Sequence, residues 1–544
     1  MQLSLLLKSG QEEPLSLNFK LKNPGDYQFL FSLSAGKEPL LLSTYPLKIE
    51  FVPLSVDITQ PFYRDNIYAT EKIKEIKARV KIGLIEEEIA GSNLIISLND
   101  KQNKTLSSKK YTDINPKQNI SLPLPDLADG RYMFSVSLNK KNKVLAKTEK
   151  TVHKLPPPKG NEVRIDKDLN MVFNGEPFLP IIWWGSSPYE EIAKSGSNGI
   201  IVGFTKDSRK PLDQLQAIGQ FGEVMLMGGS VQKKFLLNKK ELSKEAKEYI
   251  VEAVNLIKEH PALLCYYLTD EPECRALSAH LLEQEYQLMK KLDPYHPVLI
   301  CNDSVNGLYT YAHCLDMFFP DPYLCPIKNN GFSRPMSYVS MFMENAKKAG
   351  KGKKLIGITP QVFNYGECGQ VNGREPSFIE ERCMQFLAII HGARGFNYYV
   401  YGGGKGKHGA IHYPDLRIGV PYIIKELKSL APAILEGKEI KGIASDDNLH
   451  LLIKKYQGKL YIFAANILPK SLSAKITLPN TIKKLKVISE NREINAEDKS
   501  FTDNFLPYGV HIYTDSPNFA DLASLKKLEK EIKSAGGMFA LTYQ

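Results

Sequence analysis

Residues 260–273 read HPALLCYYLTDEPE, and this stretch decides the fold. Only apolar residues and one threonine separate Pro261 from Asp270 and Glu271. An apolar run of this length, bounded by a proline and by charged residues, is typical of a strand buried on both faces, as in a parallel sheet. The stretch therefore predicts a buried strand that ends in two adjacent carboxylates.

A helix is predicted immediately before this strand. Residues 243–260, SKEAKEYIVEAVNLIKEH, place apolar side chains at Ala246, Ile250, Val254 and Ile257, which share one face of a helix. The alternation of helical stretches with short apolar runs continues over the middle of the chain. The eight apolar runs are 178–185, 198–204, 223–229, 262–271, 297–303, 315–323, 354–363 and 395–403.

Eight strand–helix units within residues 163–435 predict an α/β fold, a closed (β/α)₈ TIM barrel, whose usual size is ~250 residues. An open, doubly wound sheet is the alternative. That fold carries a glycine-rich phosphate-binding turn after its first strand. No such turn follows the first run, 178–185, so the closed barrel is favoured.

The rest of the chain alternates apolar and polar residues, which predicts half-buried strands. Before the barrel we expect a partial β-sandwich in residues 1–52 and an Ig-like β-sandwich in residues 53–155, with a stiff proline-rich linker at residues 154–160. After the barrel we expect a small C-terminal β-sandwich domain in residues 436–515 and a helical tail in residues 516–544.

The composition argues against several classes of protein. The net charge of +11 comes from 71 Lys and Arg against 60 Asp and Glu, and these charges are scattered, whereas nucleic-acid binders concentrate basic residues on one face. No run approaches the ~20 apolar residues that span a bilayer. We expect neither a nucleic-acid nor a membrane partner.

The apolar start of the chain is shorter than the ~7–15-residue core of a signal peptide, so the protein is either not exported or preceded by further residues. Seven cysteines without CxxC spacing predict free thiols.

Barrel enzymes place their chemistry at the carboxyl ends of the strands. The fourth run ends in Asp270 and Glu271, and two adjacent carboxylates at the end of a buried strand cost desolvation energy unless they are used or satisfied. The structural interpretation is that Asp270 caps the next helix and Glu271 bonds to a backbone group or an arginine. The functional interpretation is that Glu271, in a partly apolar pocket, has a raised pKa and acts as a general acid.

Three motifs resemble a known group of enzymes. Residues 260–272 resemble the fourth-strand signature of retaining, clan-A-like glycoside hydrolases, in which an acidic residue or Asn, then Glu, then often Pro ends the strand. Residues 174–181, NGEPFLPI, resemble the hairpin before their first strand, and residues 391–399, HGARGFNYY, resemble their eighth strand. The resemblance covers roughly residues 163–515, and it implies that Glu271 is the acid/base and that the protein is extracellular or periplasmic.

The second carboxylate departs from that pattern. Such enzymes carry a nucleophilic Glu at the end of strand seven, where this chain has Gln361, which cannot form a glycosyl ester. Three replacements remain open: Asp321 at the end of strand six, Glu367 in the loop after strand seven, or a substrate-assisted pair of Asp270 and Glu271. We favour Asp321, although it also fits a residue that caps a loop between two prolines.

Aromatic residues gather at the same predicted strand ends, where their rings suit the C–H faces of a sugar. The candidate substrate-binding residues are Trp183, Trp184, Tyr323, Gln361, Phe363, Glu367, Tyr399 and Tyr401. Side chains alternate across a strand, so of Trp183 and Trp184 we expect one to face the sugar and the other to face the helices. The glycine-rich loop 402–409 is interpreted as a lid whose Lys405, Lys407 and His408 could meet an acidic sugar.

These features favour an enzyme that hydrolyses an oligo- or polysaccharide. The alternative from another class is a catalytically inactive, carbohydrate-binding barrel, which the missing strand-seven Glu suggests. A metal-dependent hydrolase is a third possibility, but the ten histidines are dispersed and no HxH pair ends a strand, so we expect neither a metal nor another cofactor.

Overall fold

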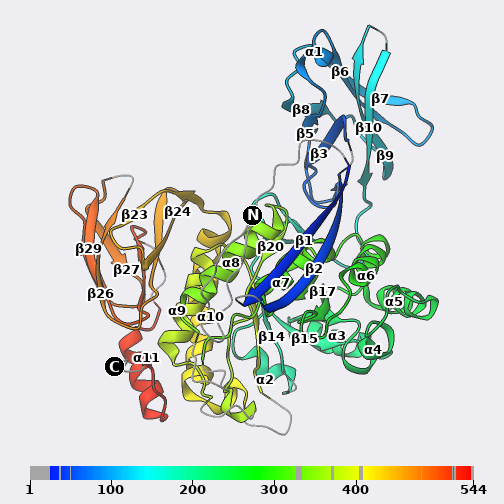
Figure 1. Ribbon diagram of the computed structural model, residues 1–544. Coiled ribbons are helices and arrows are strands. Elements are labelled where there is room, and N and C mark those ends of the chain that lie inside the picture. The colour runs from blue at the N-terminus through cyan, green and yellow to red at the C-terminus, as the bar shows by residue number, and fades with distance from the viewer. Residues whose placement is uncertain are drawn as a thin grey trace. The chain divides into compact units, whose positions relative to one another are not determined.

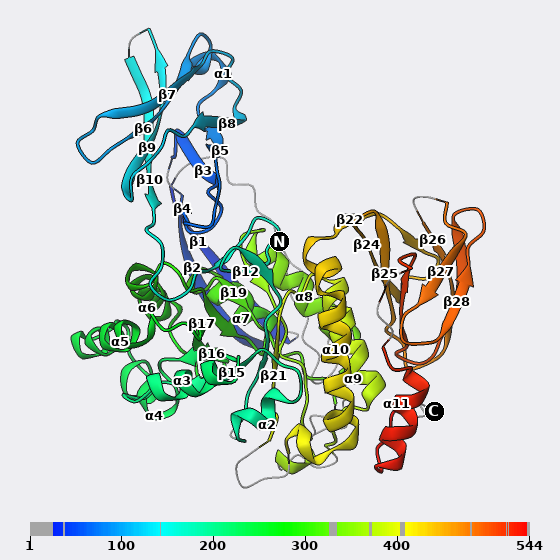
Figure 2. The same ribbon diagram turned by 180° about the vertical axis from the view of Figure 1, so that it is seen from behind.

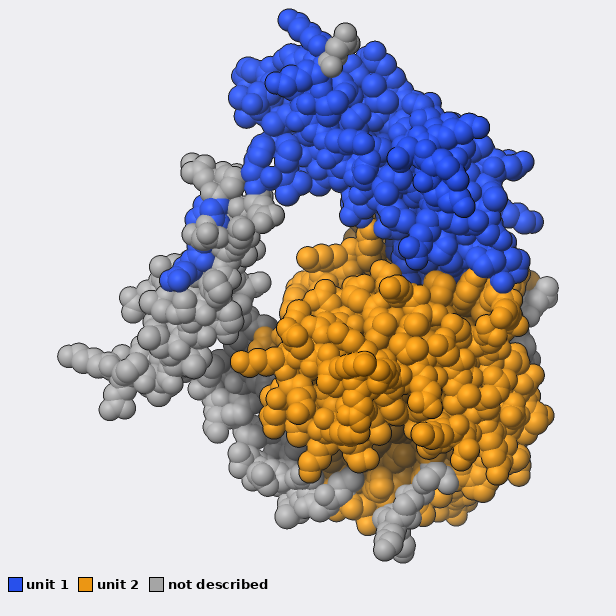
Figure 3. Space-filling view, turned by 90° about the vertical axis from the view of Figure 1, so that its right-hand side faces the viewer, with its two compact units in different colours: residues 1–157 blue, residues 158–544 orange. Residues whose placement is uncertain are grey.

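The computed structural model divides into two compact units, residues 1–157 and 158–544 (Figure 3). It describes residues 25–35, 38–49, 51–141, 143–185, 187–325, 334–368, 373–402, 408–478, 481–517, 519 and 522–540. No helix within these ranges is both long enough and apolar enough to cross a membrane.

The first unit is built from sheets whose strands are antiparallel except for the short β4 (Asn66–Ile67), which pairs with β10 (Lys143–Lys154) in parallel, and the alternation of apolar and polar residues predicts such half-buried strands. A hairpin of β1 (Gly25–Ala35) and β2 (Glu38–Ile49) forms a sheet of its own. Next come a three-stranded and a five-stranded sheet whose buried side chains form one shared core. The three-stranded sheet contains β3 (Leu54–Gln60), β5 (Glu75–Ile82) and β8 (Lys117–Pro123). The five-stranded sheet contains β4 (Asn66–Ile67), β10 (Lys143–Lys154), β9 (Gly130–Lys140), β6 (Asn93–Asn99) and β7 (Thr105–Tyr111).

The second unit contains the predicted barrel, in which all eight apolar runs form neighbouring parallel strands. In chain order these are β14 (Ile181–Trp183), β15 (Gly199–Gly203), β16 (Phe221–Met225), β17 (Leu263–Asp270), β18 (Val298–Cys301), β19 (Met317–Phe318), β20 (Leu355–Ile356) and β21 (Phe396–Tyr398). β21 pairs with β14, and parallel bridges from Ile358 to Phe396 and from Gln361 to Tyr399 join the seventh and eighth strands. The sheet is therefore closed, and the predicted fold class is confirmed.

Helices surround the barrel, and two of them begin with a serine that caps the first turn (Figures 1 and 2). In α5 (Lys244–Ile257) the Ser243 hydroxyl accepts a hydrogen bond from the backbone of Ala246. In α9 (Phe378–Ile390) Ser377 and Glu380 form a capping box, which satisfies N–H groups that the first turn leaves unpaired. The other helices of the barrel layer are α2 (Tyr189–Ala193), α3 (Arg209–Ala217), α4 (Gly229–Phe235), α6 (Ala279–Leu292), α7 (Val305–Tyr311), α8 (Ser337–Gly350) and α10 (Pro414–Glu436).

The barrel interior is packed by side chains that point inward from alternate strand positions. The ring of Phe319 occupies the space over Gly357 and Gly395, where an added Cβ would lie 2.3 Å and 2.9 Å from ring atoms. Glu223 also lies inside, accepting a 2.8 Å hydrogen bond across the barrel from the Asn397 amide, and burial raises its pKa to about 8. The interior is therefore a filled core, and its open end is left for chemistry.

The C-terminal region consists of antiparallel sheets, again as predicted. One sheet has the strand order β22 (Lys438–Ile440), β24 (Leu449–Tyr456), β25 (Lys459–Asn466), β30 (Val510–Thr514), β27 (Lys484–Val487) and β28 (Arg492–Asn495). The other joins β23 (Ile443–Ala444), β26 (Leu472–Thr477) and β29 (Ser500–Phe505). The buried Arg382 of α9 pairs with Glu426 of α10 at 2.8 Å and donates to the carbonyl of Val510, which ties these sheets to the barrel helices. The tail contains α11 (Leu525–Ser534).

Glu285 on the buried face of α6 gives a testable prediction on stability. Both carboxylate oxygens lack a hydrogen-bond partner among the described residues, and burial raises the pKa of Glu285 from 4.5 to about 8. The folded state therefore holds this proton after the unfolded state has lost it, and stability falls as the pH rises from about 4.5 to about 8. We expect Glu285→Met to stabilise the barrel by about 3 kcal/mol at pH 7 and by much less at pH 5.

Thermal unfolding followed by tryptophan fluorescence measures this effect, because both tryptophans of the chain, Trp183 and Trp184, lie in the barrel. Glu283→Met, on the partly exposed side of the same helix, is the matched control. A gain in Tm that is equal at pH 5 and pH 8 would mean that Glu285 is charged in the folded protein.

Candidate functional site

Two carboxyl groups meet at the carboxyl ends of the barrel strands. Glu271 follows β17 and Asp321 follows β19, and their two carboxyl groups lie within hydrogen-bonding reach of each other. Asp321 is 3% exposed, whereas Glu271 is half-buried. Glu271 has a φ of 41°, a left-handed backbone conformation that is uncommon for a non-glycine residue and is often found at functional sites. The sequence-predicted pair of Glu271 and Asp321 is thus brought together.

The environment raises the pKa of both groups. Burial is the main cause for Glu271, and the nearby charges of Asp270 and Asp303 add to it, while the hydrogen bond from Asp321 and the charge of Arg275 act in the opposite direction. Burial and the negative charge of Glu271 raise the pKa of Asp321 well above its ordinary range. Two carboxyl groups in contact cannot both ionise at low cost, so the pair shares one proton.

Asp270, the neighbour of Glu271, is held by its own set of partners. Its carboxylate accepts a 2.8 Å hydrogen bond from the Tyr267 hydroxyl and lies 3.6 Å from the guanidinium of Arg275. Arg275 also donates to the backbone carbonyl of Asp270 and, at 3.3 Å, to the side chain of Gln232 on α4. These contacts fix the turn that presents Glu271.

The end of β18 supplies two further polar residues, Asn302 and Asp303, which the sequence reasoning missed. The Asn302 amide donates to both oxygens of Glu273 at 3.1 Å and 3.3 Å, and burial raises the pKa of Glu273 to about 7. Asp303 accepts a 2.9 Å hydrogen bond from the thiol of Cys274. Both residues close the fifth apolar run, so the rule that found Asp270 and Glu271 would also have found them.

Aromatic rings form a continuous arc over the same strand ends. Trp184 packs edge-to-face against Tyr267 and Tyr399, with ring centroids 5.5 Å and 6.0 Å apart. Phe363 continues the arc at 5.4 Å from Tyr399 and contacts Tyr323 at 5.1 Å. Tyr365 lies 4.6 Å from Phe363. Of the predicted aromatic residues, Trp184, Tyr323, Phe363 and Tyr399 therefore lie in one arc.

Two other predicted aromatic residues lie elsewhere. Trp183 is 1% exposed and donates from its indole nitrogen to the Ser195 hydroxyl at 2.9 Å, on the helix side of β14. Tyr401 packs edge-on against Trp183 and donates to the carbonyl of Glu191. Alternation along the strand sends Trp183 outward and Trp184 inward, so of the two tryptophans it is Trp183 that faces the helices. The expectation that Tyr401 lines the site is corrected, because it belongs to this outer contact.

The predicted binding role of Gln361 also needs correction. Its side chain is fully buried, and its carbonyl oxygen accepts hydrogen bonds from the backbone N–H groups of Leu324 and Cys325 at 3.1 Å and 2.9 Å. Its amide donates to the carbonyl of Phe363 at 3.3 Å. Gln361 therefore anchors the loop after Asp321 and does not face a substrate. Glu367 is exposed on a short 3₁₀ helix, and Lys405 and Lys407 lie outside the described residues.

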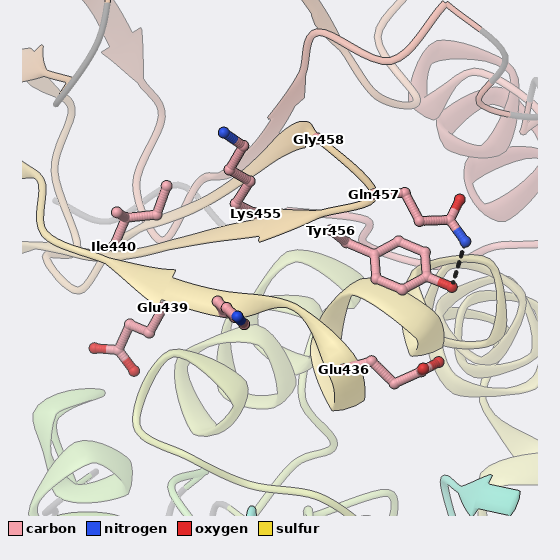
Figure 4. A pocket seen from close by; sticks show the side chains of 8 residues that line it. Glu436, Glu439, Ile440, Lys455, Tyr456, Gln457 and Gly458 are labelled. Atoms are coloured by element: carbon pink, nitrogen blue, oxygen red, sulfur yellow. Dashed lines mark hydrogen bonds between the residues drawn. The ribbon is translucent and has the colours of Figure 1, made fainter.

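Among the described residues, no group of three or more His, Cys, Asp or Glu side chains could hold a metal ion. A hollow of about 510 Å³ lies where α10 passes into β22, opposite the turn after β24 (Figure 4). Glu436, Glu439, Lys455 and Tyr456 line it, with opposite charges and no residue from a barrel strand end. The six cysteines whose side chains are described are free, as predicted.

The fold resembles those of glycoside hydrolases of known structure at low sequence identity. A family 39 glycoside hydrolase from the gut symbiont Bacteroides cellulosilyticus WH2 is 12% identical, with 81% of this chain and 97% of that chain covered and a TM-score of 0.43. A putative β-galactosidase from Bacteroides fragilis is 10% identical, with 83% and 72% covered and a TM-score of 0.35. An α-amylase from Anoxybacillus is 12% identical, with 61% and 89% covered and a TM-score of 0.42. No protein-family model and no curated protein matches the chain. The chemistry of the site must therefore follow from its own residues.

Proposed function

We propose that the protein hydrolyses glycosidic bonds of an oligo- or polysaccharide, with Glu271 as the general acid and Asp321 as the second carboxylate. One observation carries this proposal: two carboxyl groups contact each other at the mouth of a closed barrel, directly beside an arc of aromatic rings, so that they can ionise together only at high cost. Glycoside hydrolysis requires one protonated and one ionised carboxyl, and sugars pack on aromatic faces. The shared proton supports the first requirement, and the arc of aromatic rings supports the second.

The shared proton sets both roles at once. In the free protein the buried Asp321 holds the proton and Glu271 accepts the hydrogen bond. Transfer of that proton to Glu271 makes Glu271 an acid that can protonate the leaving oxygen, and it leaves Asp321 as a carboxylate at the sugar. Glu271 is the more exposed of the two, so it is the member that reaches the glycosidic oxygen.

A bound sugar has to separate the pair. Retaining enzymes hold their carboxyl groups ~5–5.5 Å apart and inverting enzymes ~6.5–9.5 Å apart, and a hydrogen-bonded pair is closer than either. The Asp321 side chain is 3% exposed and therefore has little room to move, whereas Glu271 is half-buried. We therefore infer that the Glu271 side chain, which lies on a partly exposed turn, is the one that moves when a sugar separates the two carboxyl groups.

The second candidate function is a barrel that binds carbohydrate without cleaving it. The observation that favours it is the use of Gln361, which stands where clan-A-like enzymes carry the nucleophile and here only anchors a loop. Assay of the purified full chain against aryl-glycosides and polysaccharides separates the two functions. Release of aryl alcohol or reducing ends supports hydrolysis, and binding without release supports the second candidate.

The proposal predicts how the pH dependence of activity responds to Asp303. Activity requires that the pair keep one proton, so kcat/KM falls when the pair loses it at alkaline pH. The charge of Asp303 raises the pKa of both Glu271 and Asp321. We therefore expect Asp303→Asn to move the alkaline limb of the kcat/KM profile to lower pH. Asp126→Asn, on an exposed loop of the first unit, is the control. A limb that stays in place or moves to higher pH would show that another group governs it.

A further inference from the structure

We infer that the sugar bound at the mouth of the barrel carries no carboxylate: it is a neutral or an amino sugar, held through the hydroxyl or ammonium groups that it donates. This inference rests on the proposed function, because it names the substrate class of the same site. It opposes the sequence-based expectation that the lysines of the 402–409 loop meet an acidic sugar.

The charges around the pair argue first for this class. Arg275 lies beside Asp270, so these two formal charges offset one another. The pair of Glu271 and Asp321 keeps one negative charge when it holds one proton, and Asp303 adds another. The described side chains around the acid pair therefore leave an excess of negative charge, which repels a carboxylate and attracts an ammonium group.

The hydrogen-bonding groups argue in the same direction. Two buried side-chain oxygens at these strand ends, Asn302 Oδ1 and Asp303 Oδ1, have no partner among the described residues. The orientation of the Asn302 amide is fixed, because its nitrogen donates to both oxygens of Glu273. Buried acceptors without donors are costly, so they call for a ligand that supplies O–H or N–H groups.

Three of the described donors near these strand ends, on Arg275, Tyr267 and Gln361, are already engaged by protein groups. The guanidinium of Arg275 contacts the carboxylate and the carbonyl of Asp270 and the side chain of Gln232. The Tyr267 hydroxyl donates to Asp270, and the Gln361 amide donates to the carbonyl of Phe363. A uronic acid would have to displace these partners, whereas a neutral sugar would complete the unpaired acceptors.

The test compares sugars that differ from a neutral parent at one position, C6 for the uronides and C2 for the amino sugars. We would measure kcat/KM for the α and β anomers of 4-nitrophenyl glucoside and galactoside, their uronides and the 2-amino analogues. Repulsion between a substrate carboxylate and the uncompensated negative charges of this site is expected to lower kcat/KM about 100-fold relative to the matched neutral sugar. A uronide hydrolysed as well as or better than its neutral partner would overturn the inference.

The outcomes also separate this inference from the proposed function. If no glycoside is cleaved, the proposed function fails. NMR titration with the methyl glycosides then still measures which class of sugar binds at the mouth of the barrel. Binding of neutral or amino sugars alone supports the inference, while binding of uronides, or of no sugar, overturns it.

A charge variant tests the electrostatic cause. Asp303→Asn should lower the ratio of kcat/KM for the neutral sugar to kcat/KM for the uronide several-fold, because it removes one of the charges that repel the uronide. Asp126→Asn should leave the ratio unchanged. An unchanged ratio in Asp303→Asn would show that charge does not set the preference.

Discussion

Glu271→Gln is expected to lower kcat by about 10²–10⁴-fold on a glycoside with a poor leaving group, which is the usual contribution of general acid catalysis. The amide keeps the size of the side chain and can stay in the left-handed turn, but it has no proton to transfer. Sugar binding should therefore stay close to that of the wild-type protein, as measured by calorimetry. The loss should be much smaller for an activated dinitrophenyl glycoside, because that leaving group departs without protonation.

Glu248→Gln is the matched control, since this residue is exposed on α5 and its ion pair with Lys244 is 3.8 Å long. Turnover of Glu271→Gln within a few-fold of wild type on the poor leaving group would make Glu271 a structural residue. Equal losses on both kinds of leaving group would instead indicate that the substitution disturbs the turn held by Arg275.

The barrel was predictable from sequence because its signals are local. Each strand is an unbroken apolar run, and helices α5 and α9 carry their caps within a few residues of their first turn. The carboxyl ends of parallel strands share one edge, so the acids that end the runs at Glu271 and Asp321 were expected to meet. Their contact follows from this topology.

The errors concern contacts that no local pattern records. Gln361 was expected to face the sugar, yet the loop after Asp321 folds back so that two backbone N–H groups reach its side chain. Tyr401 lies beyond the end of β21, where alternation no longer applies, and it turns toward α2. The link between Glu273 and Asn302 joins two strand ends that are distant in sequence. Such contacts depend on where distant segments of the chain pack in the folded protein. The spacing of residues within one segment does not reveal this packing.

Asp321→Asn is expected to lose activity at least as severely as Glu271→Gln, because it removes the second carboxylate and the group that holds the shared proton. The side chain is 3% exposed, and one of its oxygens has no partner among the described residues, so the isosteric amide fits the same space. Thermal unfolding should confirm that the variant folds, and kcat on an activated aryl-glycoside measures the loss.

Azide then separates the roles of the two carboxyl groups. If Asp321 is the nucleophile, azide should restore turnover of Asp321→Asn and give a glycosyl azide whose anomeric configuration is opposite to that of the substrate. Azide added to Glu271→Gln should instead attack the covalent intermediate and give a glycosyl azide that keeps the substrate configuration. An inactive Asp321→Asn that azide does not rescue would indicate an inverting enzyme in which Asp321 activates water. Full activity in Asp321→Asn would overturn the assignment of Asp321 as the second carboxylate. Glu367 would then be the next candidate. If only 2-acetamido sugars are cleaved, the candidate would instead be a substrate-assisted pair of Asp270 and Glu271.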